Sequence, residues 1–151
     1  MSKDLQEILL VAGTRSRVIE DCVVVLEREV DRKRGVSGMV IKTGFKVIKK
    51  LDRGRLLYNA VDMLLDDFTA SMNPFYQDFV ENQDKHTSFP AFVARRENEV
   101  ANALLSVTDR RRQRATNKVL IKTYDKLRGV AVANVKEGLP ELSKLIEKYA
   151  L

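Results

Sequence analysis

The chain has 151 residues, of which 44% are hydrophobic and 32% charged, and its formal net charge is +6. A chain of this length folds as one ordinary domain, and it buries enough apolar surface to need no disulfide or structural metal. Apolar residues recur along the whole chain, which excludes disorder, and no apolar run approaches the about 20 residues of a membrane span. We therefore expect one domain over residues 1–151.

The first 35 residues predict two helices separated by a glycine turn. Ser2 is a candidate N-cap for a short helix that ends near Gly13, and Thr14 or Ser16 is a candidate cap for the next helix. Gly35 follows the basic run "DRKR" and is typical of a helix end. Four apolar residues at helical spacing predict the buried face of the second helix, namely Ile19, Val23, Leu26 and Val30.

The stretch "GMVIKTGFKVIKK", residues 38–50, predicts an amphipathic basic helix with Ser37 as its cap. Its apolar side chains oppose an arc of about 100° that holds the cations. Gly44 lies in the middle of the apolar arc, where glycine costs about 1 kcal/mol relative to alanine. We expect a packing reason for this glycine, namely a neighbouring helix that crosses close to it. The five cations of the arc are Lys42, Lys46, Lys49, Lys50 and Arg53.

The middle of the chain predicts a helix from about residue 55 to about residue 72, which ends at the dipeptide Asn73–Pro74. Asn73 is a candidate cap, and Pro74 is a candidate first residue of another helix. After the polar loop "NQDKHTS", Ser88 and Pro90 are expected to open a short helical segment. The residues that the helix after Asn73 should bury are Phe75, Tyr76, Phe79 and Val80.

Further helices are predicted towards the end of the chain. One carries Val100 and Leu104, the next spans residues 117–138, and the last starts at Pro140. Strict alternation of apolar and polar residues, which would indicate half-buried strands, is missing. The sequence therefore predicts an all-α fold, a compact single-domain bundle of about seven to nine mostly short helices.

Charge is unevenly spread along the chain. Residues 36–58 hold six basic residues and one acidic, residues 59–100 hold three and eight, and residues 101–151 hold eleven and five. Two interpretations stay open. The two basic segments form a face that binds a polyanion, or the acidic segment folds against them and neutralises them, which is our preference because mixed surface charge is normal. The cations of the later segment are Arg110, Arg111, Arg112, Arg114, Lys118, Lys122 and Lys126.

Catalytic and metal-binding patterns are weak. Asp62 and Asp66 lie one helical turn apart and could share a cation, but the only histidine, His86, is in a polar loop, so the paired Glu-x-x-His motifs of a di-iron bundle are missing. Cys22 lies in the apolar run "CVVVL", which is typical of a buried small hydrophobe. Asp67 falls near the apolar arc of its helix, so we expect it to be partly buried and paired with a lysine or arginine of a basic segment.

Five separated blocks resemble a known family. They are "SGMVIKTGFKVIKK", "AVDMLLDDF", "NPFYQDF", "NALLSVTDRR" and "LPELSKLIEKYA". In this order they are similar to an uncharacterised bacterial family of small all-helical proteins, a domain of unknown function. The resemblance implies a single helical domain of bacterial type, and it implies no activity, ligand or catalytic residue.

The sequence predicts a soluble, non-catalytic binding protein that acts by its surface or by self-association, with an unknown protein partner. The first alternative is polyanion or nucleic-acid binding through the faces 42–53 and 110–126. The second is an enzyme or binder of a small apolar ligand that uses a pocket lined by the aromatic residues of 68–92 with Met63 and Met72. We expect no cofactor, metal, signal peptide or membrane partner. The single cysteine favours the cytoplasm.

Overall fold

Every regular element is helical in the computed structural model, which describes residues 3–82 and 88–151. The predicted all-α class is therefore confirmed for this part of the chain. Ser2 and His86, to which the sequence assigned a cap and a loop position, lie outside the described residues. The elements are α1 (Leu5–Leu9), α2 (Arg15–Arg32), α3 (Gly35–Lys50), a 3₁₀ turn η1 (Leu51–Gly54), α4 (Leu56–Glu81), α5 (Phe89–Arg95), α6 (Glu97–Arg114) and α7 (Lys118–Ala150).

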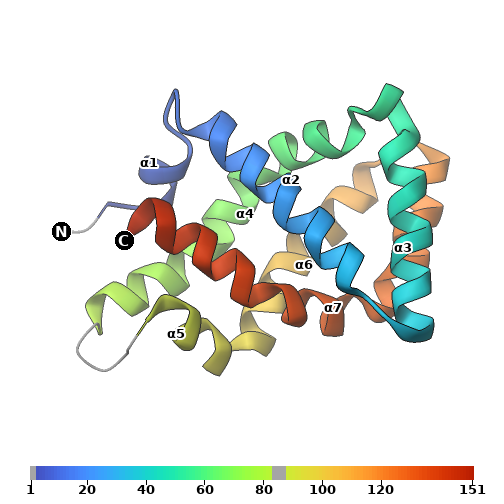
Figure 1. The fold of residues 1–151 in the computed structure, drawn as a ribbon. Helices are drawn as coiled ribbons and strands as arrows, with labels where there is room; N and C mark the ends of the chain where they lie inside the picture. The colour runs from blue at the N-terminus through green and yellow to red at the C-terminus, as the bar shows by residue number, and fades with distance from the viewer. Residues whose placement is uncertain (1–2, 83–87) are drawn as a thin grey trace.

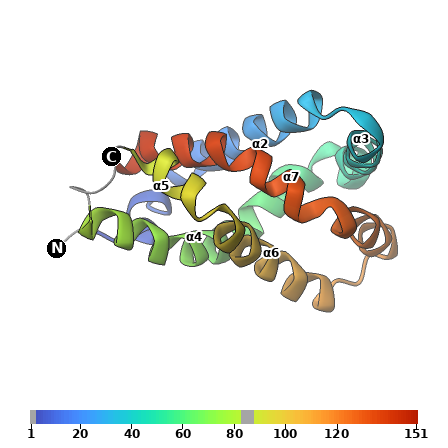
Figure 2. The ribbon, with the colours of Figure 1, turned by 90° about the horizontal axis from the view of Figure 1, so that it is seen from below.

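The longest helix, α7, connects the two ends of the molecule. It packs against α1, α2, α3, α5 and α6, while α4 packs against α1, α2 and α6. The first helix and the end of the last helix therefore lie together at one end of the molecule (Figure 1). α3 stands at the opposite end, where it crosses the first half of α7, as the view from below also shows (Figure 2).

An aromatic cluster forms the core of the end that carries the termini. Phe79 packs against both Phe89 and Phe92, with ring centroids 5.4 and 5.7 Å away, and Tyr76 meets Phe89 edge to face. Phe89 is fully buried, and the Ser88 hydroxyl accepts a hydrogen bond from the Ala91 amide at the start of α5. The burial predicted for the aromatic residues at 75–79 and the cap predicted at Ser88 are confirmed.

Two helix breaks predicted at prolines are wrong. α4 continues through Pro74, and α7 continues through Pro140 as one helix of 33 residues. Proline removes one backbone donor and disfavours a helix interior. Tertiary packing outweighs this local penalty here, because apolar residues on both sides of each proline join the same core: Met72 and Phe75 flank Pro74, and Leu139 and Leu145 lie around Pro140.

Asn73 caps a different helix from the one predicted. Its Oδ1 atom accepts a hydrogen bond of 2.9 Å from the backbone amide of Leu5, the first residue of α1. Gln77, one turn later, donates to the carboxylate of Asp4, the cap residue of α1. Because α4 continues through position 73, the Asn73 side chain does not cap its own helix and instead accepts from a free backbone amide at the start of α1.

Three further details of the predicted helix ends and faces are corrected. α3 begins at Gly35, so Ser37 is inside it, and the Ser37 hydroxyl accepts a hydrogen bond from Asn134 of α7. Thr14 precedes α2 but its side chain makes no capping bond. On α2 the buried apolar residues are Val18 and Ile19, whereas Leu26, which the sequence places on the buried face, is 39% exposed. The run "CVVVL" is apolar on all sides, so spacing alone does not identify the face that packs.

Candidate binding groove between α3 and α7

Gly44 of α3 lies close to Leu127 of α7. A Cβ atom on Gly44 would lie 3.0 Å from Cδ2 and 3.1 Å from Cδ1 of Leu127. These distances are shorter than ordinary van der Waals contact, so a side chain at position 44 would require the Leu127 side chain to shift. The close approach that the sequence predicts at Gly44 is therefore present.

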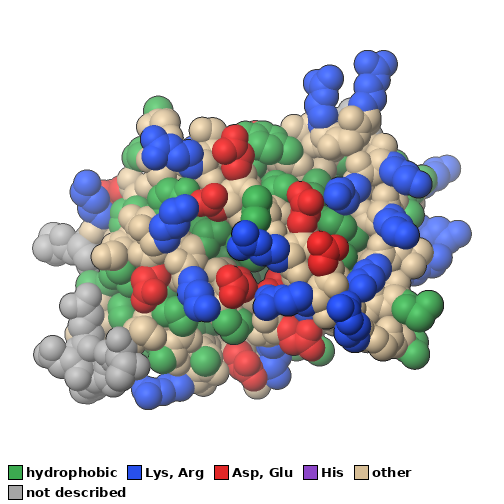
Figure 3. All heavy atoms as spheres, viewed as in Figure 1, with side chains coloured by type: hydrophobic (Ala, Val, Ile, Leu, Met, Phe, Trp, Pro, Cys, Tyr) green, Lys and Arg blue, Asp and Glu red, His purple; other side chains and the backbone are tan. Residues whose placement is uncertain are grey.

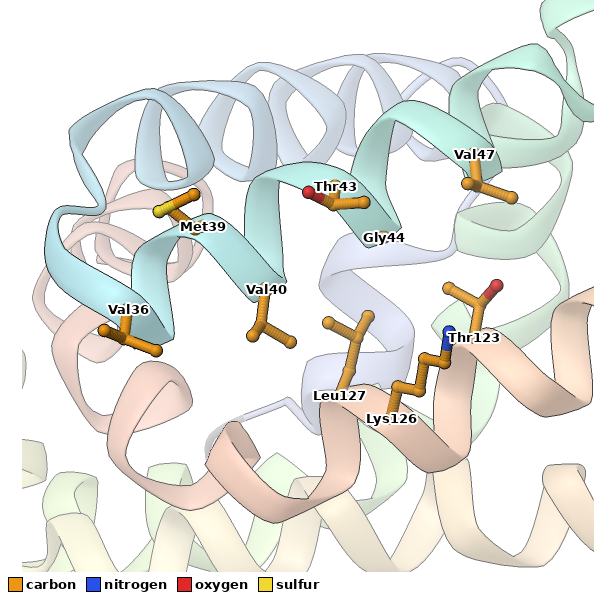
Figure 4. Close-up of a pocket in the computed structure, with 9 residues that line it drawn as sticks. All are labelled: Val36, Met39, Val40, Thr43, Gly44, Val47, Thr123, Lys126 and Leu127. Atoms are coloured by element: carbon orange, nitrogen blue, oxygen red, sulfur yellow. The ribbon is translucent and has the colours of Figure 1, made fainter.

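Along this crossing the two helices leave a groove of about 400 Å³ between them. The α3 wall is formed by Val36, Met39, Val40, Thr43 and Val47, and the α7 wall by Thr123, Lys126 and Leu127. Figure 4 shows Val36, Val40 and Val47 extending from α3 towards α7, and Leu127 rising from α7 beneath Gly44. The lining side chains offer two hydroxyl groups and one ammonium group, and the rest of the surface is apolar.

The edge of the groove exposes large apolar side chains. Val36 is 81% exposed and Met39 is 68% exposed, the two highest values among the large hydrophobic residues that the structure describes. Val119, one turn before Thr123 on α7, is also exposed. No apolar side chain of α3 is fully buried, and the only buried positions of the helix are Gly38 and Gly44. α3 is thus a wall of the bundle whose apolar face is only half covered.

Cations gather at the same end of the molecule. The start of α7 lies between α3 and the end of α6 there, so the two basic segments of the sequence meet at α7 (Figures 1 and 2). Figure 3 shows Lys and Arg side chains along this end, whereas Asp and Glu side chains lie nearer the middle of the same face. Among the described side chains of α3, only Lys49 has a carboxylate partner, Glu27 at 3.5 Å. Its neighbours Lys46 and Lys50 are exposed.

The arginines of α6 are divided between ion pairs and free positions. Arg111 binds Asp67 at 3.2 Å, which is the partner that the sequence predicts for this half-buried carboxylate, and Arg112 binds Asp125 at 2.8 Å. Arg110 and Arg114 have no ion pair within the described part of the chain; together with Arg111 and Asp67 they line a small hollow of about 50 Å³. The acidic segment therefore neutralises one of these four arginines, less than the preferred interpretation of the charge pattern expects.

A polar network next to these arginines fixes α6 against α7. Arg128 and Tyr124 both donate hydrogen bonds to Asp109, and Tyr124 also meets the Thr108 hydroxyl at 2.8 Å. The Arg128 guanidinium, with a smaller effect from Tyr124, lowers the pKa of Asp109. Burial and then the bond to Asp109 raise the pKa of Tyr124. The network therefore joins the last turns of α6 to the first turns of α7.

Three other candidate sites from the sequence are the acidic pair Asp62 and Asp66, the thiol of Cys22 and the aromatic pocket with Met63. Asp62 and Asp66 are bound by the guanidinium of Arg15, each at 3.0 Å, and no group of three His, Cys, Asp or Glu side chains in the described residues is arranged for a metal ion. Burial raises the pKa of the Cys22 thiol to about 11, which makes it a poor nucleophile. Met63 is 59% exposed and therefore does not join the aromatic residues in an internal pocket.

The sequence contains a signal for the groove that its helical pattern alone did not reveal. Val36, Val40, Thr43 and Val47 recur at helical spacing, and Met39 lies beside them. This stripe is continuous with the apolar arc, so it is indistinguishable from a buried face until the position of α7 is known. On α7, Thr123 and Leu127 are similarly placed one turn apart.

The described helices include none that is both long enough and apolar enough to cross a lipid bilayer. The model of the family of unknown function DUF6918 matches residues 5–150, from the first residue of α1 to the last residue of α7. No curated protein and no solved structure matches the chain.

Proposed function

The chain belongs to the DUF6918 family, a family of unknown function, and we propose that it is a non-catalytic binding protein whose binding site is the groove between α3 and α7. The observation that carries the proposal is the apolar groove of about 400 Å³ with Val36 and Met39 exposed at its edge. Exposed apolar surface next to a concave site is typical of a surface that a partner covers.

The composition of the groove supports binding rather than catalysis. Its lining has no carboxylate, imidazole or thiol, so it lacks the usual groups for general acid–base catalysis or for an activated nucleophile. Asp125, which lies on α7 beside Lys126, is engaged by Arg112 of α6. A groove of this kind supplies apolar contact and positive charge to a partner.

Photo-crosslinking in living cells tests this proposal. A photo-crosslinking amino acid at Val36 should give a defined adduct, because this side chain lies at the edge of the groove. Val24 on α2 is the matched control, since it is also an exposed valine, 44% accessible, but lies outside the groove. An absence of adducts at Val36, or the same adducts from both positions, would contradict the proposal.

A second candidate function is polyanion binding, favoured by the convergence of the two basic segments at one end. Lys42, Lys46, Lys118 and Lys122 have no ion pair among the side chains that the structure describes. Titration of fluorescent duplex and single-stranded oligonucleotides at about 50 and about 200 mM salt tests it, because phosphate contacts weaken steeply over this range. Micromolar binding at the higher salt that disappears in Lys46→Glu with Lys49→Glu would favour this function over the first.

The proposal also places the protein in the cytoplasm of a bacterial cell. Support for a reducing compartment comes from the single cysteine, Cys22, whose thiol burial keeps protonated. Support for a bacterial source comes only from the sequence resemblance. Immunoblotting of fractionated cells checks the location.

A further inference from the structure

We propose that the groove between α3 and α7 takes an amphipathic helix with an acidic polar face from a partner protein. This inference rests on the proposed function and specifies the chemistry of the partner. It follows from three properties of the groove: its shape, its apolar floor and the charge of its two rims.

The shape suits a rod. On α3 the lining runs from Val36 to Val47, about three turns or about 17 Å along the axis. The groove is the space between two crossing helices that touch at Gly44 and Leu127. A helix presents an apolar stripe at positions i, i+3, i+4 and i+7, which is the pattern that such a groove receives. A flat bilayer would reach Val36 and Met39 at the edge but not Leu127 on the floor.

Both rims are basic. On α3, Lys46 and Lys50 lie on the same side of the helix as the exposed Met39, because the three positions are within about 40° of one another around the helix axis. On α7, Lys126 lines the groove and Lys122 lies one turn before it. All four lysines are exposed, and no ion pair engages them within the described part of the chain. Acidic side chains on either side of an apolar stripe would meet both rims.

The same features argue against the other occupants. A second copy that placed its own groove face to face with this one would bring the basic rims together, and like charges at an interface are unfavourable. A nucleic acid would use the lysines but leave the apolar floor and the exposed Val36 and Met39 in water. An acidic amphipathic helix uses both the floor and the rims.

Three synthetic peptides of about 15 residues test the inference by fluorescence anisotropy with the full-length protein. The first has leucines at i, i+3, i+4 and i+7 and glutamates elsewhere, the second has the same composition in scrambled order, and the third has lysines in place of the glutamates. We expect the first peptide to bind at least about tenfold more tightly than the second, and the third not to bind.

Variants at exposed positions then separate apolar contact from charge. Val36→Lys with Met39→Lys removes the apolar edge and adds two positive charges, and we expect it to lower the affinity for the first peptide at least about tenfold. Lys46→Glu with Lys122→Glu should weaken it as well. Lys3→Glu with Lys144→Glu is the matched control, because it makes the same change in net charge just before α1 and late in α7, and these two helices pack together away from α3. Circular dichroism verifies that each variant is folded.

Several outcomes would overturn the inference. Equal binding of the first and second peptides, or stronger binding to Val36→Lys with Met39→Lys, would indicate a polyanion site. Tighter binding to vesicles of phosphatidylcholine and phosphatidylglycerol than to the first peptide would indicate a lipid surface. If the first peptide fails to bind while the adduct at Val36 still forms in cells, this inference is wrong and the proposed function stands. If neither occurs, both are wrong.

Discussion

Leucine at position 44 tests how closely α3 and α7 approach. A Cβ atom there would already lie 3.0 Å from Leu127, so the rest of a leucine would require the volume that Leu127 now fills. Overpacking of this kind costs about 3 kcal/mol at the upper end of its usual range, and the loss of a helical glycine returns about 1 kcal/mol. We therefore expect Gly44→Leu to lower the free energy of unfolding by about 2 kcal/mol. Urea unfolding followed by far-UV circular dichroism measures it.

Two further variants show whether the contact itself is responsible. Gly129→Leu is the matched control, because no atom lies within 4 Å of a Cβ at that position on α7, and we expect it to be neutral or stabilising. Gly44→Leu combined with Leu127→Ala moves the leucine from one helix to the other. The double variant should be more stable than the sum of the two single effects by at least about 1 kcal/mol. Additivity within about 0.5 kcal/mol, or a gain in stability from Gly44→Leu alone, would refute the reasoning.

Three other predictions concern parts of the molecule away from the groove. The Tyr149 hydroxyl donates a hydrogen bond of 2.6 Å to Asp21 and lowers the pKa of this carboxyl. The hydrogen bond therefore stabilises the fold above the ordinary pKa of an aspartate, and this stabilisation is lost as the pH falls through the lowered pKa. Tyr149→Phe should thus lower the free energy of unfolding by about 1 kcal/mol at neutral pH and by less in acid; a pH-independent difference in urea unfolding would contradict this. Asn73→Ala removes the cap on Leu5 and should lower the free energy of unfolding by about 1 kcal/mol, with faster amide exchange in α1. Unchanged amide exchange would show that this hydrogen bond does not stabilise the start of α1. Cys22, with a pKa of about 11, should react slowly with a thiol reagent in the native state and rapidly in urea. Equal rates in the two states would show that the folded protein does not shield this thiol.

The helical class and most helix positions follow from the sequence, because apolar spacing and glycine positions are local signals. The continuity of α4 through Asn73 and of α7 through Pro140 does not, because it depends on contacts with residues distant in sequence. Asn73 has the local features of a cap for its own helix, and only the position of α1 makes Leu5 its partner. Pro140 is tolerated inside α7 because the core continues on both sides of it.

The candidate site was predictable only in part. The lysine arc, the need for close packing at Gly44 and an ionic partner for Asp67 all follow from helical geometry, and the last two are present in the structure. The groove depends on where α7 diverges from α3, which no local pattern encodes. The sequence therefore does not predict the exposure of Val36 and Met39, because their apolar stripe has the same spacing as a buried helix face.

The position of α7 determines when the bundle can close during synthesis. α7 follows the other helices in the chain, yet it covers α1, α2, α3, α5 and α6. At about 5–20 residues per second, the ribosome needs about 2–7 s for the 33 residues of this helix. During this time the surfaces of five helices that α7 covers stay exposed, so the nascent chain offers them to chaperones, and a stalled ribosome within α7 would leave a product that cannot complete its core.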